Sequence, residues 1–77
     1  MNIEKVAEIL MQNKLHDGYI EAQLKHDVER LGSEKAKYYV LSFSPSKLGR
    51  LGFLGLRKLA IVRRDHPDVF EKIKEVW

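Results

Sequence analysis

The 77-residue sequence contains no cysteine. This absence excludes disulfide bonds and any zinc site built on thiolates, which are common supports of small domains. It also fits a reducing compartment, and we expect the protein to be cytoplasmic. A chain this short must therefore gain its stability from helix packing, from self-association or from a bound partner.

Long apolar runs are absent as well. The sequence has no stretch of 18 apolar residues, which is about the length needed to span a bilayer. Its first residues, MNIEKVAEIL, lack the basic region and apolar core of a signal peptide. With 44% hydrophobic and 32% charged residues, the composition is that of a globular chain. We expect a single domain over residues 1–77.

Catalytic and metal-binding signatures are missing too. His16, His26 and His66 each neighbour an aspartate, but adjacent residues on a helix point in different directions and do not form a dyad. Neither His-Glu-x-x-His nor the phosphate loop Gly-x-x-x-x-Gly-Lys-Ser/Thr occurs. We therefore expect no enzyme, no cofactor and no metal.

Apolar residues recur at helical spacing through most of the chain. Asn2 and Asp17 are expected to cap the first two helices, and Pro67 is expected to begin the last one. Residues 33–42 read as helix or strand, but a lone strand has no partner within the chain, so we favour helix. The sequence predicts an all-α fold of four to five short helices around a single small core. The expected segments are residues 3 to about 14, about 18 to 31, 33–42, about 54 or 55 to 65 or 66, and a last helix that starts at residue 67.

Positive charge is concentrated in residues 46–64, although the net charge of the whole chain is only +3. This stretch has no Asp or Glu, and segments with a net negative charge lie near both ends of the chain. Phosphate contacts need Lys and Arg, so we expect a nucleic-acid-binding regulator, with DNA more strongly indicated than RNA. The candidate phosphate contacts are Lys47, Arg50, Arg57, Lys58, Arg63 and Arg64.

Gly49, Gly52 and Gly55 stand at three-residue spacing inside this stretch. They predict a short helical turn, then a glycine-rich loop and a new helix from Leu54 or Gly55. The N–H groups at the start of that helix could bind a phosphate, whereas close approach of two helices explains the glycines more simply. The same stretch resembles an interfacial helix in composition, but we do not expect membrane binding, because the core needs its apolar residues. Those residues are Leu51, Phe53, Leu56 and Leu59.

A helix-turn-helix over residues 24–41 is a second hypothesis. Gly32 would end one helix, Ser33-Glu34-Lys35 would form the turn, and Lys35 and Lys37 would face a groove. A plain helical hairpin explains the same residues, and this alternative stays open.

The rival functional hypothesis is a protein–protein adaptor or inhibitor. In that case the basic stretch meets an acidic protein surface, and aromatic side chains supply the apolar anchors. These anchors would be Tyr38, Tyr39, Phe53 and Trp77, although Trp77 could equally dock on the domain's own core. Homodimerisation is also open for so small a domain.

Overall fold

The computed structural model describes all 77 residues and contains six α-helices and no strand. The all-α prediction is confirmed, including the helix over residues 33–42. The count exceeds the expected four to five because the short segment after Ser44 closes into a helix of its own. The helices are α1 (Ile3–Gln12), α2 (Ile20–Leu31), α3 (Ser33–Ser42), α4 (Pro45–Arg50), α5 (Leu54–Asp65) and α6 (Pro67–Glu75).

Local signals set most helix ends. Asn2 caps α1 as expected, because its Oδ1 accepts the N–H of Lys5 at 3.1 Å. Pro45 and Pro67 occupy the first positions of α4 and α6, where a missing N–H costs nothing. Asp17 does not cap α2, since its Oδ1 accepts the N–H of Tyr19 in a turn that precedes the helix.

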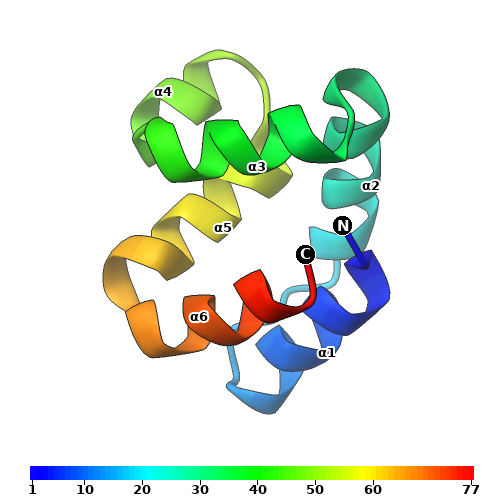
Figure 1. Cartoon of the computed structure of the whole chain (residues 1–77), viewed down its shortest axis with the longest axis vertical. Helices are drawn as coiled ribbons and strands as arrows, with labels where there is room; N and C mark the ends of the chain where they lie inside the picture. Colours follow the sequence, from blue (N-terminus) through cyan, green and yellow to red (C-terminus); the bar gives the residue numbers. More distant parts are fainter.

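Two pairs of helices lie at the two ends of the molecule, and α2 and α5 run between them. Figure 1 shows α3 and α4 at the upper end, and α1 and α6 at the lower end. The two chain termini lie close together, and both contact Ser33 at the start of α3. There the Met1 amino group hydrogen-bonds Ser33 Oγ, and Trp77 Nε1 donates to the Ser33 carbonyl at 3.2 Å.

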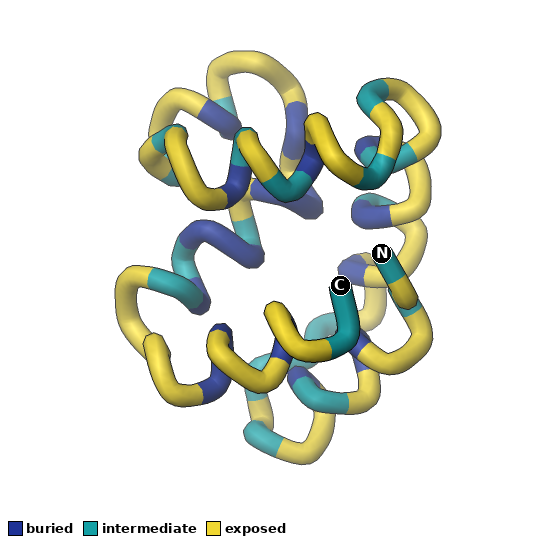
Figure 2. Tube along the Cα trace, viewed as in Figure 1, coloured by how far each residue is buried: buried dark blue, intermediate teal, exposed yellow.

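Buried side chains from all six helices form one cluster, and Figure 2 shows that α5 contributes along most of its length. Phe53, Leu56 and Leu59 lie in this cluster as expected. Leu51 does not, since 44% of it is exposed. The expectation that the core needs Leu51 is therefore wrong, because the residue falls in the turn after α4. The cluster comprises Val6, Leu10, Ile20, Leu24, Ala36, Val40, Leu48, Phe53, Leu56, Leu59, Ala60, Val62, Val69, Phe70 and Ile73.

Each of the three regularly spaced glycines is required by a different feature of the structure. A Cβ on Gly55 would lie 2.6 Å from the Leu24 backbone nitrogen, so Gly55 permits close packing of α5 on α2. Gly52 has φ +83°, a conformation that other residues rarely adopt. Gly49 leaves room for the side chain of Arg57, whose Cδ would lie 3.1 Å from an added Cβ.

Candidate nucleic-acid interface

The candidate interface is built on α4, the turn at residues 51–53 and the start of α5. The Ser44 hydroxyl caps α4 by accepting the N–H of Lys47 at 3.2 Å. After α4, the N–H of Phe53 donates to the Leu48 carbonyl at 3.0 Å, and the Phe53 side chain is buried. The hydrogen bond and the buried ring fix the direction in which α5 leaves the turn.

The N-terminus of α5 is occupied by a carboxylate from α2. Asp27 Oδ2 accepts the N–H groups of Gly55 and Leu56 at 2.9 and 3.0 Å, and Phe53 makes no side-chain cap. The expectation that these N–H groups bind a phosphate is therefore wrong. Asp27 is 2% exposed, and burial raises the pKa of its carboxyl while the two N–H donors act to lower it.

Arg63 supports α3 and is not free for a phosphate. Its guanidinium nitrogens donate to the carbonyls of Leu41 at 2.7 Å and Phe43 at 3.4 Å. These carbonyls lie at the end of α3, where backbone acceptors lack partners within the helix. The predicted role of Arg63 in phosphate contact therefore conflicts with its position.

Arg64 and Lys58 are paired with carboxylates. Arg64 donates twice to Asp65, at 2.8 and 3.1 Å, and this hydrogen bonding lowers the pKa of the Asp65 carboxyl. Lys58 Nζ lies 3.6 Å from Asp17 Oδ2. The Arg64–Asp65 pair is exposed and the Lys58–Asp17 pair is half-buried at the surface, so both reduce the local charge without excluding contact with another anion.

Lys47, Arg50 and Arg57 have no carboxylate partner and are exposed. Lys47 Nζ lies 4.3 Å from the centre of the Phe43 ring, a cation–π contact that holds the ammonium on the surface of α4. Arg57 lies against α4 at Gly49. The fold therefore gathers these three cations on α4 and the adjoining turn of α5.

The hypothesis of a helix-turn-helix at residues 24–41 does not agree with the structure. Only Gly32 separates α2 from α3, and Ser33, Glu34 and Lys35 form the first turn of α3. Lys35 is exposed and Lys37 is half-buried, and neither has a carboxylate partner. A three-residue turn that contains a glycine lies instead between α4 and α5.

The predicted aromatic anchors differ in exposure. Tyr38 is 60% exposed, whereas Phe53 is 7% exposed and belongs to the core. Tyr39 is half-buried against Phe53, with ring centres 5.7 Å apart. Trp77 packs on the core cluster. Of the four, Tyr38 is the one with most of its surface free, and Phe53 is unavailable as an anchor in this structure.

Two residues of α2 that support α5 and the turn before it were not predicted from the sequence. Asp27 holds α5, and Arg30 lies 4.4 Å from the centre of the Phe53 ring. Asp27 follows Ile20 by seven residues and Leu24 by three, so it stands on the apolar side of α2. An acid in that register is the signal that could have revealed the cap.

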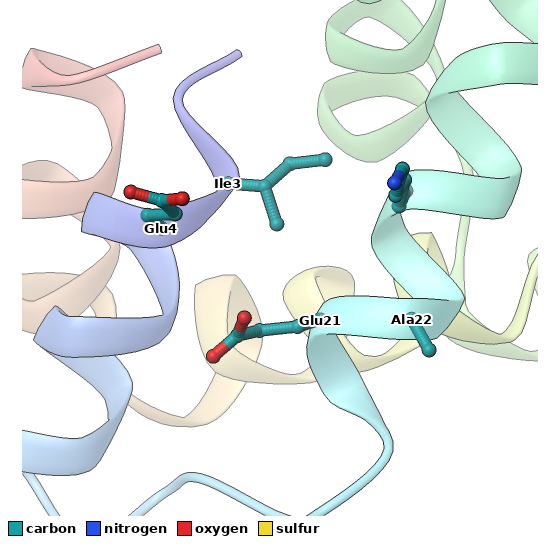
Figure 3. Close-up of a pocket in the computed structure, with 5 residues that line it drawn as sticks. Ile3, Glu4, Glu21 and Ala22 are labelled. Atoms are coloured by element: carbon teal, nitrogen blue, oxygen red, sulfur yellow. The ribbon is translucent and has the colours of Figure 1, made fainter.

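Other features of the surface lie away from this region. An open groove of about 530 Å³ lies between α1 and α2, and Figure 3 shows Ile3 of α1 directed toward α2. No group of three or more His, Asp or Glu side chains is placed to hold a metal ion. None of the helices combines the length and apolar character needed to cross a bilayer. The groove is lined by Ile3, Glu4, Glu21, Ala22 and Lys25.

All eleven acids lie outside residues 35–64, a stretch that carries eight Lys and Arg residues. In the fold this stretch forms most of α3, all of α4 and nearly all of α5. Chemically, such a surface can bind an anion through ammonium and guanidinium groups. The chain matches no model of a protein family, no curated protein sequence and no solved structure.

Proposed function

We propose that the protein is a non-enzymatic nucleic-acid-binding protein that contacts phosphates through Lys47, Arg50 and Arg57. The observation that carries the proposal is the exposure of these three cations on adjoining elements, with no carboxylate paired to any of them. Lys and Arg in such a position neutralise phosphates and release condensed counterions, which provides affinity without sequence specificity. As the sequence suggests, we propose that this binding serves a regulatory role.

Lys35 and Lys37 add positive charge on α3, the helix that precedes α4. No acid occurs between Glu34 and Asp65, so residues 35–64 carry positive charge without an acid of their own. The potential of several cations of one sign attracts a polyanion over distances up to about a Debye length, roughly 8 Å at physiological salt. We expect α3 to contribute to attraction more than to direct contact.

The test is fluorescence anisotropy with labelled duplex DNA, single-stranded DNA and an RNA hairpin, each across a salt series. The wild type is compared with the triple variant Lys47→Gln/Arg50→Gln/Arg57→Gln. We expect the variant to lose most of its affinity at low salt. The slope of log K against log salt should fall by about one for each cation removed.

A matched control removes three positive charges from the other half of the molecule. Lys5, Lys25 and Lys72 are exposed and unpaired, so Lys5→Gln/Lys25→Gln/Lys72→Gln changes the net charge by the same amount. This control should keep nearly the full salt slope. Equal losses in both triple variants would reduce the effect to net charge, and absence of binding to all three nucleic acids would overturn the proposal.

The protein–protein adaptor is the second candidate. Four large apolar residues are exposed on α3 and around the turn before α5, at 39–60% of their surface. Exposed apolar side chains beside cations are a common composition at protein interfaces. If an acidic protein is the partner, Tyr38→Ser should weaken binding as much as the loss of Arg57 does, and nucleic acid should not compete. The four residues are Tyr38, Leu41, Leu51 and Leu54.

A further inference from the structure

The segment formed by α4, residues 51–53 and α5 has the parts of a helix-turn-helix unit. Its turn has three residues, and Gly52 supplies the left-handed conformation that the turn requires. Gly49 leaves room for the side chain of Arg57 from α5, and the buried Phe53 anchors the turn in the core. Figure 1 shows the chain leaving α4 at the top of the molecule and turning back behind α3 into α5.

One side of α5 remains open to solvent. The helix packs against α2, α3, α4 and α6, which together cover its other sides. Leu54, Arg57 and Ile61 follow one another at spacings of three and four residues, so they share the uncovered side. Leu54 is 49% exposed, Arg57 is exposed and Ile61 is half-buried. This row of Leu54, Arg57 and Ile61 is named the α5 stripe.

We infer that this unit binds duplex DNA with the α5 stripe in the major groove and reads base sequence there, an inference that rests on the proposed function. Arg57 would donate to the O6 and N7 of a guanine, the commonest specific contact in that groove. Leu54 and Ile61 are suited to contact with thymine methyl groups. Lys47 and Arg50 on α4 would bind the adjoining phosphates and fix the register.

Duplex DNA fits this surface better than RNA does. The major groove of B-form DNA is about 12 Å wide and admits a helix, whereas that of A-form RNA is too narrow for one. A surface for single strands would stack successive bases on several exposed rings. Of the four clustered rings Tyr38, Tyr39, Phe43 and Phe53, only Tyr38 is exposed, so such a surface is missing.

Two acids lie beside the open side of α5, Asp17 on one flank and Asp65 at the end of the helix, where it pairs with Arg64. Asp17 approaches from the turn before α2, and Lys58 pairs with it there at 3.6 Å. On the other flank, Arg57 lies against Gly49 of α4, where no acid is present. A phosphate backbone would therefore approach along α4, and the Lys58–Asp17 pair would lie toward the opposite edge of the groove.

The test selects bound sequences from a pool of random DNA duplexes. The wild type should enrich a common motif that contains a guanine recognised by Arg57. Arg57→Gln should shift that position toward adenine, because a Gln amide matches the N6 and N7 of adenine, and should cut the preference for guanine about tenfold or more. Arg50→Gln is the matched control, expected to weaken binding to all sequences alike and to leave the motif unchanged.

A chemical substitution in the DNA separates groove reading from phosphate binding. Replacing the recognised guanine by 7-deazaguanine removes N7 and should weaken the wild type several-fold, with little further loss in Arg57→Gln. If the wild type binds duplexes with a steep salt slope but enriches no motif, or if Arg57→Gln leaves the motif unchanged, the inference is overturned and the proposed function stands. Absence of binding to every nucleic acid overturns both.

Discussion

The two ends of the molecule are held together by different kinds of contact. At the lower end, α1 and α6 pack through apolar side chains, and no side-chain hydrogen bond or ion pair joins these two helices. At the upper end, cationic side chains add to the apolar packing, since Arg63 binds the end of α3 and Arg30 and Lys47 lie over aromatic rings. Some of the cations in the basic part of the sequence therefore stabilise the fold, and only the remaining ones are available to bind a ligand.

The charges of the two ends follow the same division. The lower pair, α1 and α6, holds three lysines against five acids, whereas the upper pair, α3 and α4, holds three lysines and one arginine against a single glutamate. At the upper end, the Arg50 side chain makes no ion pair or cation–π contact, and Lys47 makes a cation–π contact with Phe43. Cations therefore outnumber acids at the upper end, where they are available to a ligand, and acids outnumber cations at the lower end.

The largest expected effect tests the helix that connects the two ends. Gly55→Ala should destabilise the protein by about 3 kcal/mol, because the new Cβ would meet the backbone of α2 at 2.6–2.9 Å and α5 would have to move. Gly18→Ala is the matched control, since nothing lies within 4 Å of its added Cβ. Urea unfolding followed by circular dichroism measures both. Equal stability of the two variants would show that α5 and α2 are less tightly packed than described.

The next effect tests the cap on α5. Asp27→Ala should cost about 2–3 kcal/mol, because it leaves two buried N–H groups without an acceptor. Asp27→Asn keeps an oxygen at the same place and should cost less. Unfolding in urea at neutral pH measures the difference, and equal losses in the two variants would argue against the hydrogen bonds.

The same carboxyl makes a prediction about pH. Burial raises the pKa of Asp27 above its ordinary 3.8, so the folded chain holds this proton more tightly than the unfolded chain. That contribution to stability is present below pH 3.8 and is lost as the pH rises through the raised pKa. The stability of the wild type relative to Asp27→Asn should therefore fall as the pH rises from 3.8. A difference that rises over this range would contradict the shift.

A smaller effect distinguishes a structural cation from an exposed one. Arg63→Ala should destabilise the protein by about 1–2 kcal/mol, because it frees the carbonyls at the end of α3. Arg64→Ala removes the same charge from the next position, where the guanidinium contacts only the neighbouring Asp65, and should leave stability unchanged. Thermal unfolding compares the two. A larger loss for Arg64→Ala would reverse the assignment.

The smallest effect concerns the C-terminus. Trp77→Phe keeps an aromatic ring but removes the N–H that donates to Ser33, so it should cost under about 1 kcal/mol. Trp77→Ala should cost more, because packing against the core is also lost. Hydrogen exchange of the Ala36 amide, which donates to the Gly32 carbonyl in the first turn of α3, should increase in both variants. Unchanged exchange in Trp77→Ala would show that α3 does not depend on the terminus.

The sequence predicted the helices well because their ends depend on neighbouring residues. Asn2, Gly32 and Pro67 act within one turn of their own positions, and the structure confirms each. The predictions that Asp17 caps α2 and that Leu51 belongs to the core are wrong, because neither outcome depends on neighbouring residues alone. Each lies in a turn whose path is set by the elements on both sides, and a periodic pattern carries no information about that path.

The candidate site was only half predictable. The sequence by itself determined that positive charge gathers in residues 46–64, since that follows from composition alone. Only the tertiary structure decided which cations are free, because the deciding partners are distant in sequence. Asp27 reaches α5 across 28 residues, and Arg63 reaches Leu41 across 22. Contacts of that range depend on how helices pack, which no local pattern encodes.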